Sequence, residues 1–256
     1  MKKSAILFVL FFLIIPAVHS QTYEEMYQKG IKYRNEFKYI EALAIFQVLL
    51  KVDSANSDYL SNGSILYSKV GNIQADEKKK MEYFHSGEKL AKKAIASNTA
   101  NSESHYAYAL ALGRLNENAS SKEKIANAKL IKTEAETAIR LNPAHAGAYH
   151  ILGRWHRTIA DFGFVEKLAI NTMFGGVPQG GSYDAAIEAF KNAIKYEPKY
   201  LLHYYELAET YHSRNSGEVD KKAAKEALKQ ALELPLSTPD DPATKKKCEE
   251  LLKKLE

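Results

Sequence analysis

The chain has 256 residues, of which 45% are hydrophobic and 26% charged. This composition is ordinary for a folded soluble protein and excludes a low-complexity chain. The net charge of +5 is too small to indicate a nucleic-acid-binding protein. The single cysteine, Cys248, excludes an internal disulfide, so stability must come from packing.

The N-terminal segment differs from the rest of the chain. Lys2 and Lys3 precede a continuous apolar run over residues 5–15, and small residues follow it. This order is typical of a secretory signal peptide, with cleavage expected before Gln21. The run is shorter than the roughly 20 apolar residues that span a bilayer. An uncleaved anchor is the alternative.

Two consequences follow from this leader. We expect residues 1–20 to be a signal peptide and residues 21–256 to form a single helical-repeat domain. We also expect the mature protein to be exported, to a periplasm or to the outside of the cell. No other segment of the sequence is long and apolar enough to cross a membrane.

The same spacing of aromatic and small residues recurs along the chain and predicts helical hairpins. Each unit carries an aromatic residue, a leucine and a small residue on its first helix, and alanine and phenylalanine on its second. This arrangement resembles the tetratricopeptide repeat, in which two antiparallel helices form one unit. The expected hairpins cover residues 23–54, 57–99, 102–143, 146–198 and 201–235.

The first hairpin fits this template well, since Gly30, Tyr33, Ala42 and Phe46 fall in register. The second and third fit less well. We expect them to contain extended polar loops, through "GNIQADEKKK" over residues 71–80 and "NENASSKEK" over residues 116–124.

The fourth and fifth hairpins give the clearest internal match. "NPAHAGAYHILGRWH" and "EPKYLLHYYELAETYH" share one layout of proline, aromatic, leucine and small residues. Small residues let two helices approach closely, so we expect Gly153 and Ala186 to face each other. The residues predicted to hold the repeats together are Gly30, Tyr33, Ala42, Phe46, Tyr149, Leu152, Gly153, Ala186, Phe190, Ala193 and Pro198.

The fourth hairpin contains an insertion. Gly153 and Ala186 are 33 residues apart, where the repeat expects twelve. Phe164, Leu168 and Met173 recur at helical spacing and predict an inserted amphipathic helix near residues 159–181. A glycine pair then ends this helix, and Ser182 is the expected N-cap of the next one.

The last helix is expected to begin near Pro242. Cys248, Leu251, Leu252 and Leu255 form an apolar stripe, and lysines cover its other face. Such a helix fits the polar cap that a solenoid needs at its end. The predicted fold is therefore all-α: a tetratricopeptide-like helical-hairpin solenoid of about five hairpins plus a C-terminal capping helix.

The block "LGRWHRTIADFGFVEKLAINTMFGGVP", followed by "SYDAAIEAFKNAIKYEP", resembles the regulators of microtubule dynamics. The resemblance extends over most of residues 60–240 and is specific at this block. It implies a tetratricopeptide-like all-helical protein, and some members of that family associate with microtubules. This sequence departs from the family in having an export signal instead of a cytosolic or membrane-anchored start.

Motifs for catalysis are absent from the sequence. HExxH, CxxC and GxSxG do not occur, and "GGVPQGG" lacks the Lys-Ser/Thr pair of a phosphate loop. His203 and Glu206 have the spacing of half a di-iron site, but the partner motif is missing. We expect no enzyme activity, no metal and no cofactor.

A basic and aromatic groove is the one functional pattern. First helices line the concave surface of such a solenoid, and arginine can pair with a carboxylate through two parallel bonds. The alternative is that these are ordinary solvated side chains. The predicted groove residues are Arg34, Lys69, Tyr106, Arg114, His150, Arg154, Arg157 and Tyr205.

This groove predicts an exported, non-catalytic scaffold that binds a protein or peptide partner with acidic groups. Two alternatives remain open. One is a carrier of a lipid or another apolar ligand, which would need a continuously apolar lining. The other is a microtubule-associated protein, if the chain is not exported.

Overall fold

The computed structural model describes residues 22–163, 176 and 178–256. The predicted signal peptide and most of the predicted inserted helix lie outside these residues. The regular elements within them are all α-helices. After a first helix that includes residues 22–35, they are α2 (Tyr39–Val52), α3 (Ser57–Asn72), α4 (Glu77–Ser97), α5 (Ser102–Leu115), α6 (Ser121–Leu141), α7 (Ala146–Asp161), α9 (Tyr183–Tyr196), α10 (Leu201–Arg214), α11 (Glu218–Glu233) and α12 (Asp241–Lys254).

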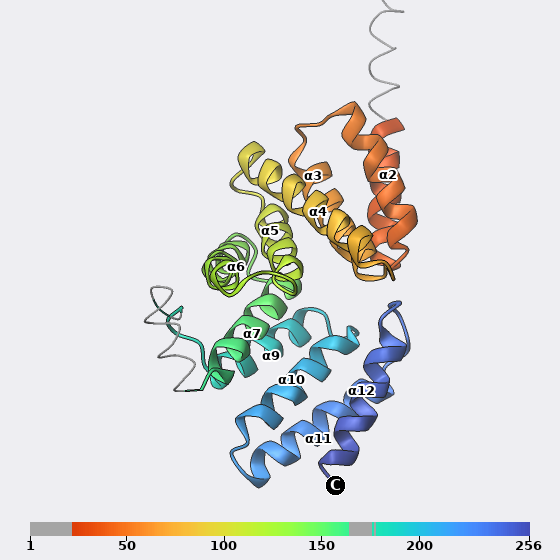
Figure 1. The fold of residues 1–256 in the computed structure, drawn as a ribbon. Coiled ribbons are helices and arrows are strands. Elements are labelled where there is room, and N and C mark those ends of the chain that lie inside the picture. Colours follow the sequence, from red (N-terminus) through yellow and green to blue (C-terminus); the bar gives the residue numbers. More distant parts are fainter. Residues whose placement is uncertain (1–21, 164–175, 177) are drawn as a thin grey trace, which may run out of the picture.

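The helices pair as hairpins, which confirms the predicted fold class. α3 packs on α4, α5 on α6, α7 on α9 and α10 on α11, while α12 covers both helices of the last pair. The first helices α3, α5, α7 and α10 also contact one another in that order. Figure 1 shows the hairpins as an arc that runs from α2 to α12. A row of first helices therefore forms one continuous side of the arc.

The two polar stretches expected as extended loops are each about half helical, so the connections are shorter than expected. α3 continues to Asn72 and α4 begins at Glu77, and α6 begins at Ser121. Side-chain caps explain these early starts. Asp76 accepts a hydrogen bond from the Lys79 backbone, and Ser120 forms a reciprocal capping box with Glu123. The extra residues lengthen the second helices instead of the loops.

Glycine and phenylalanine meet inside three of the hairpins. A Cβ placed on Gly30, Gly71 or Gly153 would lie 2.8 Å from the ring of Phe46, Phe84 or Phe190, respectively. We expected Gly153 to face Ala186, but the atoms nearest to that position all belong to the Phe190 ring. The lack of a side chain at these glycines lets the facing rings fill the space between the two helices.

The other predicted repeat residues are distributed between core and boundary. Ala42, Ala186 and Ala193 are fully buried. Tyr33, Tyr149 and Leu152 are half-buried, and Pro198 is exposed in the turn between α9 and α10. Its carbonyl accepts a hydrogen bond from the Tyr204 hydroxyl, at 2.9 Å. Ser182 caps α9 as expected, by accepting from the Ala185 backbone.

The two ends of the arc meet through a few side chains. The Phe37 ring stacks on the Tyr200 ring, with 6.4 Å between their centroids. The Asn72 amide donates to the Asp240 carboxylate at 3.5 Å. The turn before α10 and the start of α12 therefore reach across to the first two hairpins (Figure 1). Across the described residues, no helix is long and apolar enough to cross a membrane.

Candidate binding surface

The predicted groove residues lie on the row of first helices. Arg34 belongs to the first helix, Lys69 to α3, Tyr106 and Arg114 to α5, His150, Arg154 and Arg157 to α7, and Tyr205 to α10. The structure adds partners for them from neighbouring elements. We use the name inner wall for the eight predicted residues together with Glu103, His145, Tyr200, His203 and Glu206.

At the N-terminal end of the inner wall, Arg34 is paired. Its guanidinium lies 3.3 Å from the Glu103 carboxylate and donates to the Asn62 side-chain oxygen. Glu103 also lies 3.7 Å from His145, whose ring centroid is 4.6 Å from that of Tyr106. Burial lowers the pKa of His145. The Arg34 charge is thus balanced within the chain.

The centre of the inner wall joins α3 to α7 and α10. The Lys69 ammonium donates to the Tyr200 hydroxyl at 3.4 Å, and the Tyr200 ring lies 4.7 Å from the His203 ring. His203 and His150 face each other through their Nδ1 atoms at 2.9 Å. Three first-helix segments are therefore linked here by polar and aromatic side chains.

Both central histidines are held neutral. Burial and then the neighbouring His203 hold the pKa of His150 well below its usual value. Burial also lowers the pKa of His203, against a hydrogen bond to Glu197 that favours its protonated form. One imidazole of the pair can therefore donate to the other without either carrying a charge.

At the C-terminal end, two arginines share one carboxylate. Glu206 is only 6% exposed. Arg157 contacts its Oε2 at 2.5 Å and Arg154 lies 3.6 Å from its Oε1. Arg157 is largely buried, whereas the Arg154 side chain is 53% exposed. Arg154 is therefore the arginine at this end that a partner could reach.

Tyr205 occupies the edge of the inner wall that faces α12. Its hydroxyl donates to Glu209 at 2.9 Å, and the Lys247 ammonium lies over its ring, 5.9 Å from the centroid. These contacts of Tyr205 are with Glu209 and Lys247 and not with the other predicted groove residues.

Sequence reasoning missed the acidic members of the inner wall. Glu103 lies in the first turn of α5, and Glu206 lies on α10 where that helix packs against α7. The usable signal was the chemistry of the predicted arginines. A buried arginine requires an acceptor, and a carboxylate on a neighbouring first helix can supply it.

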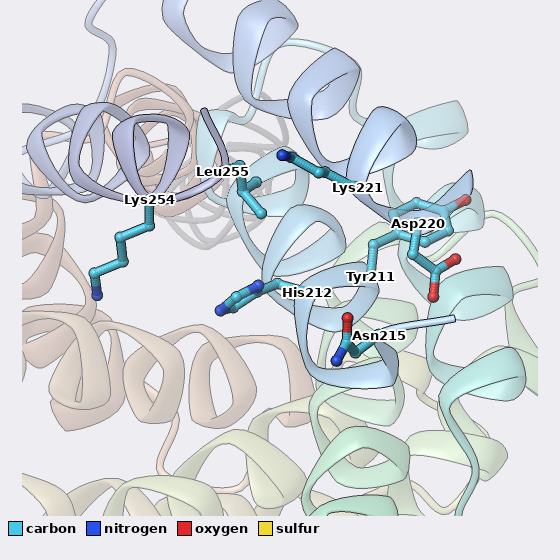
Figure 2. Close-up of a pocket in the computed structure, with 7 residues that line it drawn as sticks. All are labelled: Tyr211, His212, Asn215, Asp220, Lys221, Lys254 and Leu255. Atoms are coloured by element: carbon cyan, nitrogen blue, oxygen red, sulfur yellow. The ribbon is translucent and has the colours of Figure 1, made fainter. Parts of the chain in front are cut away.

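A second concave feature lies at the C-terminal end of the chain. A pocket of about 200 Å³ lies there. Figure 2 shows the residues that line it, Tyr211, His212, Asn215, Asp220, Lys221, Lys254 and Leu255. Its carboxylate is already engaged, since Asp220 accepts from Arg214 and from the Ser216 backbone. The acid of this pocket is therefore committed to the fold and not to chemistry.

Metal chemistry has no obvious centre in the part of the chain that the structure describes. No group of three or more histidine, cysteine or acidic side chains stands close enough there to hold an ion. His203 and Glu206, which have half the spacing of a di-iron site, contact His150 and two arginines instead.

Comparison with known sequences gives one consistent family. The sequence model of regulator of microtubule dynamics proteins 1–3 matches residues 21–256. Regulator of microtubule dynamics protein 1 of Bos taurus is 30% identical over 180 residues, which cover 70% of this chain and 55% of that protein. Protein 3 of Bos taurus is 30% identical over 210 residues, covering 80% and 44%, respectively. The chain thus spans about half the length of these relatives.

Comparison with solved structures supports the fold. The crystal structure of a thermophilic TPR protein from Thermus thermophilus superposes with a TM-score of 0.63. The match covers 90% of this chain and 98% of that one, at 17% sequence identity. At that identity the likeness concerns the fold alone.

Proposed function

We propose that this chain, which belongs to the regulator of microtubule dynamics protein family, is a non-catalytic scaffold that binds a segment of a partner protein along its inner wall. The observation that carries the proposal is the continuity of this wall. Helices α3, α5, α7 and α10 contact one another in order, and each contributes polar or aromatic side chains to the same strip. Such a strip offers contacts to an extended segment of a partner over several repeats.

The character of the lining favours a peptide over an apolar ligand. An apolar carrier buries its ligand in a mainly hydrophobic cavity. The inner wall instead presents the pair Arg34–Glu103, the pair His150–His203 and Arg154 beside Glu206. These groups suit hydrogen bonds and ion pairs with a polypeptide.

The ion pairs within the chain limit which arginines are available to an acidic partner. Arg157 and Arg34 already have carboxylate neighbours, so a partner would have to compete with them. Arg154 is more accessible, because half of its side chain is exposed. We therefore assign Arg154 the role of the outer contact for an acidic group.

Capture experiments with paired variants test this proposal. The chain is used as bait in an extract of its own host, and Arg154→Glu is compared with Arg140→Glu, a matched change on α6 away from the inner wall. We expect Arg154→Glu to lose the captured partner and Arg140→Glu to keep it. Equal capture by both variants would remove the inner wall as the binding surface.

Export is a separate part of the proposal. It is supported by the basic start at Lys2 and Lys3 and the apolar run that follows. N-terminal sequencing of the protein from its native host should find Gln21 at the start. A soluble cytosolic species that keeps Met1 would contradict export.

A microtubule-associated role is the second candidate, and family membership is the observation that favours it. It requires a chain that remains in a compartment containing tubulin. Cosedimentation of the purified chain with polymerised tubulin tests it directly. Recovery of the chain with the polymer would support this role, and its absence from the pellet would count against it.

A further inference from the structure

Lys69 is a cation inside the fold, and in the described part of the chain no carboxylate pairs with it. It stands in the last turn of α3, and its ammonium lies 5.7 Å and 5.6 Å from the ring centroids of Tyr39 and Tyr200. It donates a hydrogen bond to the Tyr200 hydroxyl. Within the described residues, no acidic side chain lies within 4.0 Å of it, although most cations of the inner wall have such a partner.

Arg114 is the second weakly compensated cation. It lies in the last turn of α5, and its side chain is 18% exposed. Its ion pair is with Glu117, at 3.5 Å, just beyond the end of the same helix. Its Nε–H is buried and meets no hydrogen-bond acceptor among the described residues. A guanidinium with a free buried donor can still bind an oxyanion.

The position of both residues at helix ends explains only part of this arrangement. A helix C-terminus carries a partial negative charge, which favours lysine or arginine in the last turn. This effect does not supply an acceptor for the Arg114 Nε–H, and it does not require the Lys69 ammonium to point between aromatic rings. Burying a charged group without its full set of partners is costly, so these two cations favour an anion beside them.

Lys69 and Arg114 stand in the last turns of two first helices, α3 and α5, that pack against each other. Both lie close enough to His150 to lower its pKa, after burial and His203, and Arg154 acts in the same direction. The nearby Glu206 is already shared between Arg154 and Arg157, and Glu197 is engaged with His203. Among the described residues, neither of these carboxylates forms an ion pair with Lys69 or Arg114.

We propose that the centre of the inner wall is an anion site, in which Lys69 and Arg114 hold one carboxylate of the bound segment beside the hydroxyl of Tyr200. This proposal rests on the proposed function and identifies the residues that anchor the bound segment. A carboxylate fits better than a phosphate, because Glu117 already offsets part of the Arg114 charge and a single negative charge balances the remainder.

Small anions test the site without any partner. The melting temperature of the purified chain is measured in sodium acetate, sodium phosphate and sodium chloride at equal ionic strength. A ligand that binds only the folded state raises the melting temperature, so acetate at several times its dissociation constant should raise it by about 2–4 °C over chloride. The variant Lys69→Met should lose this response, and in chloride it should be at least as stable as the parent.

Two further variants make the result decisive. Lys89→Met removes a lysine of α4 that lies away from the inner wall and should respond to acetate as the parent does. Arg114→Gln should lose the response, and it decides the matter if Lys69→Met does not fold. An equal acetate shift in the parent and in Lys69→Met or Arg114→Gln would overturn the site, and a response to phosphate alone would overturn the carboxylate assignment.

The anchor and the proposed function can fail separately. Lys69→Met can also be tested in the capture assay used for Arg154→Glu. Capture of the partner equal to that of the parent would overturn the anion site but not the scaffold function. The opposite result is an acetate response that depends on Lys69 together with partner capture that does not depend on Arg154. This result would support the anion site and overturn binding of the partner segment along the inner wall.

Discussion

At the scale of single residues, the family block around Gly153 is explained by three different contacts. Gly153 faces the Phe190 ring, the Arg154 guanidinium approaches Glu206, and the Trp155 indole donates to the Ala128 carbonyl at 2.8 Å. Consecutive residues on α7 therefore contact α9, α10 and α6. One short triplet thus links α7 to the helices on three sides of it.

The glycine contact gives the first prediction. Gly153→Leu should lower the free energy of unfolding by about 1–3 kcal/mol or more, because the new side chain overlaps the Phe190 ring in a packed core. Gly113→Leu is the matched control, since apart from its chain neighbours and its own helix backbone no atom of the described residues lies within 4 Å of a Cβ at that position. Denaturant titration measures both variants. Similar stabilities for the two variants would show that the packing of α7 on α9 is described wrongly.

At the scale of elements, turns decide where helices end, and the turn between α10 and α11 is tied by one carboxylate. Asp220 is 1% exposed and accepts from the Arg214 Nε–H at 2.9 Å and from the Ser216 backbone at 2.8 Å. The turn also contains Asn215 and Gly217, both at positive φ. Arg214 and Asp220 hold this strained turn closed.

The same arginine provides an internal control. Arg214 also pairs with Asp184, which is 81% exposed. Asp220→Ala should destabilise the fold by about 1–3 kcal/mol, because it leaves a charged donor and a backbone N–H without their acceptor. Asp184→Ala should change stability by only about 0–1 kcal/mol, as exposed ion pairs do. Thermal unfolding compares them, and a larger loss for Asp184→Ala would contradict this account.

Prediction from sequence worked for the elements that a spacing rule controls. The five hairpins and the capping helix at Asp241–Lys254 were found because packing repeats along the chain. The lengths of α4 and α6 were missed because local caps at Asp76 and Ser120 decide them. Such caps are visible in sequence, but long polar runs also favour loops, and composition alone does not distinguish the two.

The candidate site was predictable only in part. Repeat register placed the basic and aromatic residues on first helices, which is where they lie. It could not predict that Glu206 would pair with Arg154 and Arg157, because this depends on how α10 packs against α7. The contact of Lys69 with Tyr200 spans 131 residues of sequence and follows from the curvature of the whole arc.

At the scale of the whole molecule, neutral histidines stand where hairpins meet. His145 lies at the start of α7 beside Tyr106 of α5, and His150 of α7 contacts His203 of α10. Burial is the first cause of a lowered pKa in each of them. The junctions between neighbouring hairpins therefore depend on imidazoles that remain uncharged.

This arrangement predicts loss of stability in mild acid. Each histidine has a folded pKa below the unfolded value of about 6.5, so protons bind preferentially to the unfolded chain as pH falls below that value. The free energy of unfolding should be steady above about pH 7 and should decrease between about pH 6.5 and 5, before carboxylates titrate. Urea titrations at several pH values measure this. A free energy of unfolding that stays constant over this range would contradict the neutral assignment.

The binding of a partner segment along the inner wall is the central claim, and photocrosslinking from two positions tests it most directly. A photoreactive residue is placed at Thr158, one turn beyond Arg154 on α7, or at Val219, which is 76% exposed on α11. Both chains are irradiated with the captured partner. We expect crosslinks to the partner from position 158 and none from position 219. Crosslinks from position 219 alone would show that the partner binds elsewhere on the arc.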